Sequence, residues 1–102
     1  MIEQLEQLRK ADQETWERIN RWELNFAHPE EVFLTRAIVQ AVLQEAITGR
    51  KWLYEQTTFT ARPSAKIWNP DWQIDHYICR PGDSPAEALL EAYLETIKGA
   101  RQ

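Results

Sequence analysis

The sequence predicts an α+β fold in which a three-stranded antiparallel meander is packed with helices, in the order α-α-β-β-β-α. Apolar residues recur at helical spacing before residue 49 and after residue 84. The stretch between them alternates instead and is rich in aromatic and β-branched residues. A chain of 102 residues, 43% of them hydrophobic, has room for one modest core. We therefore expect a single α+β domain over residues 1–102.

The first helix is expected from Ile2 to Trp22, within an N-terminal helical segment 1–26. Its apolar residues form a narrow stripe, which is typical of a surface helix or of a coiled-coil seam. The stripe includes Leu5, Leu8, Trp16 and Ile19. We treat the segment as a candidate oligomerisation element and predict a homodimer with a two-fold contact through the first two helices. The alternative is that the first helix folds back onto the second within one monomer.

The second helix is expected to begin at Pro29, because proline suits a first helical position and the acidic Glu30 and Glu31 follow it. Its apolar residues cover more than half of its circumference, which predicts the central helix of the core. The remaining stripe is polar and consists of Arg36, Gln40 and Gln44. Gly49 is placed to end the helix in a left-handed conformation.

Three strands are expected over Lys51–Thr60, Ala65–Asn69 and Trp72–Cys79. The residues Asn69-Pro70-Asp71-Trp72 have the chemistry of a type I turn between the second and third strands. Closing that turn pairs Ile67 with Ile74 and Lys66 with Asp75, so that like residues meet on one face and opposite charges on the other.

The last helix has the clearest start, with Ser84 as N-cap, Pro85 at the first position and Glu87 as the capping-box partner. Its apolar face contains Leu89, Leu90, Tyr93, Leu94 and Ile97. We expect Glu87, Glu91 and Glu95 to form its solvated face, and Gly99 to close it.

Several functional classes are disfavoured by the sequence. With 12 Lys+Arg against 16 Asp+Glu, the net charge is −4, which argues against general binding to nucleic-acid phosphates. The three glycines do not form a phosphate-binding loop. No stretch is apolar over the length of a membrane span and no signal peptide is visible, so we expect a cytoplasmic protein. The single cysteine, Cys79, fits a reducing compartment.

The candidates for catalysis and metal binding are few. His76 and Cys79 point to opposite faces of a strand, and no set of about four ligands has zinc spacing. A hydrolase built around Glu55, Asp75 and His76 is the weaker alternative, since Asp75 is expected to pair with Lys66. We therefore expect no enzyme, no catalytic residues, no metal and no cofactor.

Aromatic residues are the most unusual feature of the three strands. They are Trp52, Tyr54, Phe59, Trp68, Trp72 and Tyr77. They either fill the core or form an exposed platform for a partner or a planar ligand, flanked by basic residues. On the second interpretation, the candidate binding residues are Trp52, Tyr54, Arg62, Trp68, Trp72 and Arg80.

The segment Gly82-Asp83-Ser84-Pro85-Ala86-Glu87-Ala88-Leu89-Leu90-Glu91-Ala92 resembles the end of the phage ABA sandwich domain. Members of that family look like a tryptophan-bearing strand region followed by a G-D-T/S-P-A-E-A turn into a final helix. Trp52 and the turn at Trp68-Asn69-Pro70-Asp71 match the same outline in order, over about half of the chain. The family pattern often has Cys and Arg in the last helix, where this chain has Leu90 and Glu91. The resemblance implies a phage or prophage origin and an α-β-α layered fold, with no established activity.

From these observations we expect a small, non-enzymatic phage or prophage accessory protein that binds a host protein, for example to inhibit a host factor or a defence complex. The acidic surface and the lack of a catalytic motif favour this interpretation. The alternative is a small-molecule or nucleotide binder that uses the aromatic face of the sheet together with Arg62 and Arg80.

Overall fold

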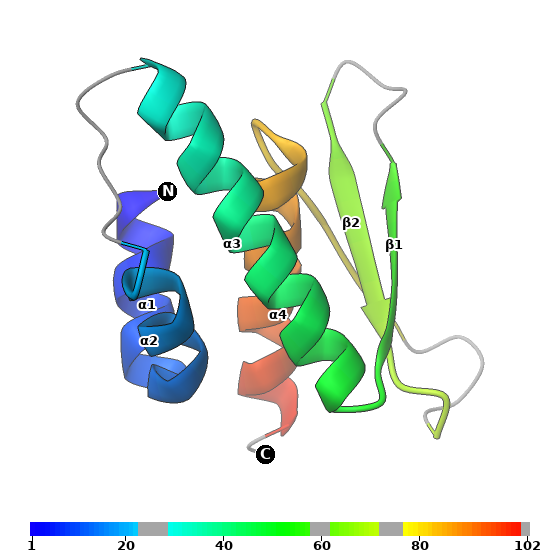
Figure 1. Ribbon diagram of the computed structural model, residues 1–102. Coiled ribbons are helices and arrows are strands. Elements are labelled where there is room, and N and C mark those ends of the chain that lie inside the picture. The colour runs from blue at the N-terminus through cyan, green and yellow to red at the C-terminus, as the bar shows by residue number, and fades with distance from the viewer. Residues whose placement is uncertain (23–28, 58–61, 72–76, 101–102) are drawn as a thin grey trace.

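The computed structural model describes residues 1–22, 29–57, 62–71 and 77–100, and has the predicted α+β class. The chain order is α1 (Ile2–Ala11), α2 (Gln13–Asn20), α3 (Pro29–Gly49), β1 (Leu53–Thr57), β2 (Ser64–Trp68), β3 (Ile78–Pro81) and α4 (Pro85–Ala100). Helices α3 and α4 pack on one face of the sheet, and α1 and α2 pack on the far side of these helices (Figure 1). The described helices thus lie on one side of the sheet, in an α-α-β layering that differs from the α-β-α layering the family resemblance implies.

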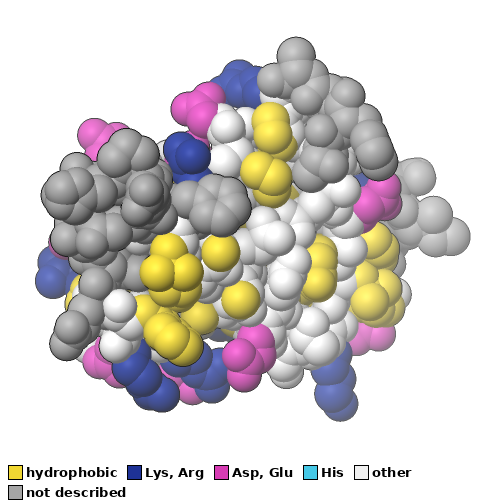
Figure 2. Space-filling model, turned by 45° about the horizontal axis from the view of Figure 1, so that its top comes forward, with side chains coloured by type: hydrophobic (Ala, Val, Ile, Leu, Met, Phe, Trp, Pro, Cys, Tyr) yellow, Lys and Arg dark blue, Asp and Glu magenta, His cyan; other side chains and the backbone are white. Residues whose placement is uncertain are grey.

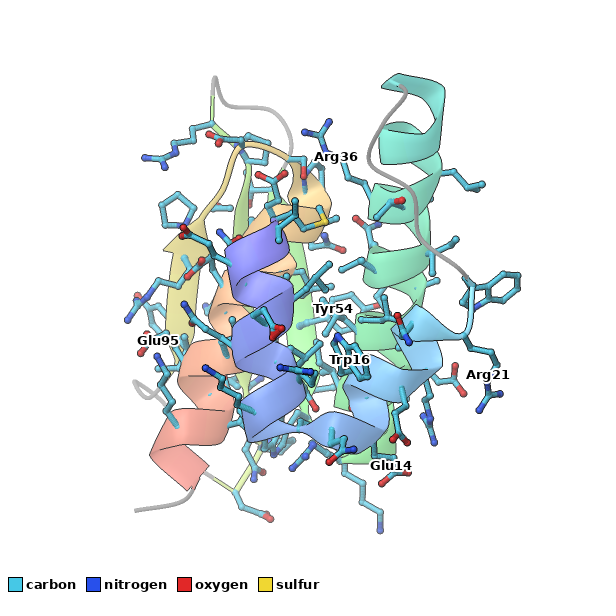
Figure 3. All side chains as sticks on the ribbon, turned by 90° about the vertical axis from the view of Figure 1, so that its left-hand side faces the viewer. Glu14, Trp16, Arg21, Arg36, Tyr54 and Glu95 are labelled. Carbon is cyan, nitrogen blue, oxygen red and sulfur yellow. The ribbon has the colours of Figure 1, made fainter. Side chains whose placement is uncertain are left out.

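The N-terminal segment forms two helices, so the prediction of one helix from Ile2 to Trp22 was wrong. The helix breaks at Asp12, whose φ of −150° and ψ of 79° are not helical. Asp12 caps the second helix, because its carboxylate accepts hydrogen bonds from the backbone N–H of Thr15 at 3.3 Å and from its hydroxyl at 2.7 Å. The chain therefore turns back, and α2 lies beside α1 (Figure 3).

This helical hairpin packs onto the rest of the monomer. Leu8 and Ile19 are 0% and 1% exposed, and Leu5 is buried with them in the common core. Trp16 is half-buried against the same core, with the guanidinium of Arg9 5.7 Å from its ring centroid. The stripe that we considered for a dimer contact is therefore packed inside the monomer, as in the alternative that the N-terminal segment folds back within one chain.

Helix α3 is the central helix, as predicted, and contacts α2, α4 and β1. Val39, Leu43 and Ile47 are each fully buried. The polar stripe packs against neighbouring elements: Gln56 of β1 accepts from Gln44 at 3.1 Å and donates to Gln40 at 3.3 Å. Arg36 forms an ion pair with Glu87 of α4 at 3.4 Å.

The end of α3 differs from the prediction, since no described glycine has a positive φ and Gly49 lies within the helix. The left-handed residue is Lys51, with a φ of 63°. Its N–H donates to the carbonyl of Thr48 at 2.9 Å, and the N–H of Trp52 donates to the carbonyl of Ile47 at 3.1 Å. These two bonds define a Schellman motif, with Lys51 at the position that glycine usually takes.

The sheet is an antiparallel meander in the order β1-β2-β3. Strand β2 has the predicted length and begins one residue earlier than predicted, and β1 begins two residues later. Residues 58–60 of the first predicted strand and 72–76 of the third lie outside the described residues. Ile67 pairs with Ile78, and Lys66 pairs with Cys79, so the predicted partners Ile74 and Asp75 were wrong. The register is shifted by four residues, which leaves every side chain on its predicted face and again opposes two isoleucines.

Helix α4 begins as predicted, because the backbone N–H of Glu87 donates to the hydroxyl of Ser84 at 3.2 Å. The helix lies between the sheet and α1, so Leu89, Leu90 and Tyr93 are fully buried. The prediction that Glu87 is solvated was wrong: its side chain is only 12% exposed and is paired with Arg36. Helix α4 continues through Gly99 and does not end there.

Candidate functional site

The aromatic residues that we considered as one platform are divided between the two faces of the sheet. Trp52 is 8% exposed, with its ring centroid 6.3 Å from that of Tyr93, so it belongs to the core. Tyr54 is half-buried against the same core, on the helix side of the sheet (Figure 3). Trp68 lies on the opposite face, and Trp72 and Phe59 lie outside the described residues. Trp52 and Tyr54 therefore do not share a surface with Trp68.

The two candidate arginines do come together, at the start of α4. Arg62 and Arg80 line a polar hollow of about 300 Å³ whose wall also contains Asp83, Glu87 and Glu91. Arg80 lies 3.7 Å from the carboxylate of Glu95 and donates to the carbonyl of Cys79 at 2.8 Å. Because carboxylates surround both guanidinium groups, this hollow does not have the charge of an anion site.

The outer face of the sheet carries an apolar row. Leu53 pairs with Trp68 across β1 and β2, and Tyr77 precedes β3. The ammonium group of Lys66 lies 4.2 Å from the ring centroid of Tyr77 and 5.3 Å from that of Trp68. Leu53 and Tyr77 are 47% and 49% exposed. The row is therefore an accessible apolar surface with one positive charge held between two rings.

A groove between α2 and α3 was not predicted from the sequence. It has a volume of about 710 Å³. Its lining comes from the end of α2 and from one side of α3, and consists of Arg18, Arg21, Trp22, Ala37, Ile38, Ala41, Val42 and Glu45. Figure 2 shows hydrophobic side chains bordered by basic and acidic ones on the face that includes α2 and α3. Trp22 is 64% exposed, and Leu34, one turn before Ile38 on α3, is 59% exposed.

The groove exists because the central residues of its floor are small. Ala37 and Ala41 are exposed and lie one turn apart on α3, where larger side chains would fill the space. Three charged residues also line the groove, Arg18, Arg21 and Glu45, and Arg21 extends from the end of α2 (Figure 3). Arg18 also forms an exposed ion pair with Glu14 at 3.5 Å.

The best-connected polar cluster of the described residues joins the α1–α2 turn to α3 and α4. Oδ2 of Asp12 accepts hydrogen bonds from the hydroxyl of Tyr93 at 2.5 Å and from Nη2 of Arg50 at 3.3 Å. Nε of Arg50 also donates to the Tyr93 hydroxyl at 3.2 Å, and its guanidinium carbon lies 5.1 Å from the Trp52 ring centroid. These groups satisfy one another across three helices.

The pKa values of this cluster are shifted in the directions that its geometry implies. Burial by itself would raise the pKa of Asp12, but hydrogen bonds from Tyr93 and Thr15 and the charge of Arg50 outweigh it, so this pKa lies below its ordinary value of 3.8. Burial raises the pKa of Tyr93 above 10.0, and the adjacent carboxylate raises it further. Tyr93 therefore stays protonated and Asp12 stays ionised at neutral pH, which suits a structural contact.

Of the candidates for metal binding, only Cys79 lies among the described residues. Cys79 is exposed on the outer face of the sheet, and Asp75 and His76 lie outside the described residues. In the described ranges, no three His, Cys, Asp or Glu side chains are close enough to share a metal ion. Nor does any helix there have the length and apolar character that a membrane span requires.

No protein family, no curated protein and no solved structure matches the chain.

Proposed function

We propose that this chain is a small, non-enzymatic accessory protein of a phage or prophage, and that it acts by binding a host protein through the groove between α2 and α3. The observation that carries the proposal is the groove itself, an apolar floor with arginines on its rim, on a protein whose net charge is −4. The sequence resemblance at Gly82–Ala92 supports the phage origin.

The occupant that fits this groove is an amphipathic helix of the host protein. Leu34, Ala37 and Ala41 lie on one side of α3, at the spacing that contacts a second helix along its length. The two alanines allow a close approach, and Trp22 offers a large ring at the side. Arg18 and Arg21 favour acidic residues beside the apolar stripe of the incoming helix.

Binding of this kind explains how a protein without a reaction of its own acts as an inhibitor. A host helix held in the groove is withheld from its usual partner, and a host factor or defence complex that depends on that helix is then inactive. The arrangement of Asp12, Tyr93 and Arg50 supports a role without catalysis, because Tyr93 is 0% exposed and its hydroxyl is occupied by the other two groups.

The alternative, a binder of small planar ligands on an aromatic face of the sheet, has less support. Such a site needs several rings on one surface, and Trp52 and Tyr54 lie on the helix side of the sheet while Trp68 lies on the other.

Affinity capture from a lysate of the bacterial host, with matched variants, tests the proposal. Leu34→Ser and Leu53→Ser replace two exposed leucines, one beside the groove and one on the sheet. We expect one stoichiometric host protein to be captured by the wild-type chain and by Leu53→Ser, and to be lost with Leu34→Ser and with Ala41→Glu. Titration calorimetry with the identified protein then measures the effect, about tenfold or more in Kd for a central contact.

Charge reversal at the rim gives a second test. Arg21→Glu should weaken capture, whereas Arg62→Glu, in the separate hollow at the start of α4, should leave it unchanged. If capture is lost with Leu53→Ser and survives every groove variant, the host protein binds the sheet and the proposal for the groove is wrong.

A further inference from the structure

The outer face of the sheet has a pattern that is complementary to itself. On β1 the outward residues include Leu53 and Glu55, and on β2 they include Trp68 and Lys66. Leu53 stands opposite Trp68, and Glu55 stands opposite Lys66. The outer face of β1 and β2 therefore has one cross-strand pair of apolar residues, Leu53 and Trp68, and one of opposite charges, Glu55 and Lys66.

We infer that this face binds a second copy of the chain, about a two-fold axis that runs parallel to the strands, midway between β1 and β2. Rotation about such an axis exchanges the two strands, so that β1 of each copy lies over β2 of the other. Glu55 then faces Lys66 of the second copy, and Leu53 faces Trp68 of the second copy. Both matches occur twice, as a symmetric interface requires.

Lys66 is prepared for this contact. Its ammonium group already lies over the rings of Tyr77 and Trp68, at 4.2 and 5.3 Å from their centroids, so a long side chain loses less freedom when the second copy arrives. Stacked sheets lie about 10 Å apart, a gap that side chains such as Leu53 and Trp68 fill from both sides. No residue of the buried core has to move.

The charges favour a second copy over a strongly charged partner. Glu55 and Lys66 are cross-strand neighbours, so their opposite charges cancel when seen from a distance. The face therefore attracts neither an acidic nor a basic surface. A copy of the same face places each of these charges opposite its counterion and covers the apolar row at the same time.

The size of the face indicates that the dimer is weak. The two overlapping strands have five residues each, and with a spacing of about 4.8 Å and a rise of about 3.3 Å per residue they give a footprint of roughly 160 Å². This is well below the roughly 800 Å² that each partner buries in a stable complex. We therefore expect the dimer to form only at high concentration and the chain to be a monomer in dilute solution.

Sedimentation equilibrium at concentrations up to about 1 mM tests the inference, since a weak dimer forms only at high concentration. The wild-type chain should shift from 12.1 kDa toward twice that mass as concentration rises. Glu55→Lys and Lys66→Glu should each weaken the dimer about tenfold or more, because each places like charges opposite one another. The double variant restores opposite charges and should return to within about threefold of the wild-type constant.

The controls separate this surface from the groove and from loss of folding. Glu55 is exposed, so Glu55→Lys leaves the core intact, and thermal unfolding of each variant checks this. Leu34→Ser, beside the groove, should leave the dimer unchanged. A mass of 12.1 kDa at every concentration overturns the inference. So does a dimer that survives both charge reversals, one that the double variant fails to restore, or one that is lost with Leu34→Ser.

Discussion

The hydroxyl of Tyr93 donates a hydrogen bond to the carboxylate of Asp12 at 2.5 Å, across 81 residues of sequence. The bond ties the turn between α1 and α2 to the buried side of α4. Arg50, just beyond α3, contacts both groups, so three helices meet at one carboxylate. The N-terminal hairpin is therefore held by a specific polar contact as well as by its apolar stripe.

Replacement of Tyr93 by Phe should destabilise the protein by about 1–3 kcal/mol, because the half-buried carboxylate of Asp12 loses a donor that no water replaces easily. Urea unfolding followed by circular dichroism measures the change. Tyr77→Phe is the matched control: its hydroxyl belongs to an exposed side chain, and the free energy of unfolding should change by less than about 0.5 kcal/mol. Equal effects of the two variants would contradict the role of Tyr93.

The same contact predicts a loss of stability in acid. The pKa of Asp12 is lower in the folded than in the unfolded chain, so its contribution is present above the unfolded value of about 3.8 and is lost as pH falls through the folded pKa. The difference in unfolding free energy between wild type and Asp12→Asn should therefore be constant near neutrality and shrink below about pH 4. A difference that persists unchanged at pH 2 would show that the charge of Asp12 contributes nothing.

Gly82 should not tolerate a side chain. A Cβ there would lie 2.8 Å from Cα of Ala88 and closer still to its backbone nitrogen, while the N–H of Gly82 bonds the carbonyl of Pro63 at 3.0 Å. Gly82→Ala should cost about 1–3 kcal/mol, because the strand end must move away from α4. Gly99→Ala, within α4 and with nothing within 4 Å of the added carbon, should be neutral or stabilising by up to about 1 kcal/mol. The thermal midpoints of the two variants should therefore move in different directions.

The N-cap of α4 should contribute about 1 kcal/mol to the free energy of unfolding. Ser84→Ala removes the acceptor of the Glu87 backbone N–H and should lower the unfolding free energy by that amount. Ser64→Ala, on β2, makes the same chemical change outside a helix cap. A thermal melt that is unchanged by Ser84→Ala would contradict the cap.

Lys51 offers a stabilising change. Its positive φ of 63° is costly for a residue with a side chain, and glycine adopts this conformation freely. Lys51→Gly should raise the unfolding free energy by up to about 1 kcal/mol, measured by denaturant unfolding. Gly49→Ala, inside the helix and with open space around it, is expected to stabilise as well, since Gly49 does not adopt the left-handed conformation. A loss of stability in Lys51→Gly would argue against strain at this turn.

Much of the fold was readable from local signals. Pro29 and the cap at Ser84 predicted where α3 and α4 begin, because these residues act within one turn of their own backbone. The alternation of apolar and polar residues in the middle of the chain predicted three antiparallel strands. The apolar residues around most of the circumference of α3 predicted that it is the central helix. The sequence by itself therefore determined the fold class and the order of the elements from α3 onward, but not the division of the N-terminal segment into two helices.

Tertiary structure decided what depends on distant partners. Asp12 looks like one more polar position in an amphipathic helix, but in the structure it caps α2 and accepts hydrogen bonds from Tyr93 and Arg50, which lie far away in sequence. A four-residue change of register leaves the faces of the strands unaltered, so the alternation could not distinguish Ile74 from Ile78 as the partner of Ile67. The groove and the division of the aromatic residues depend on which helix covers which surface. The spacing of apolar residues shows which face of a helix or strand is apolar. The packing of elements far apart in sequence decides whether that face is buried or exposed.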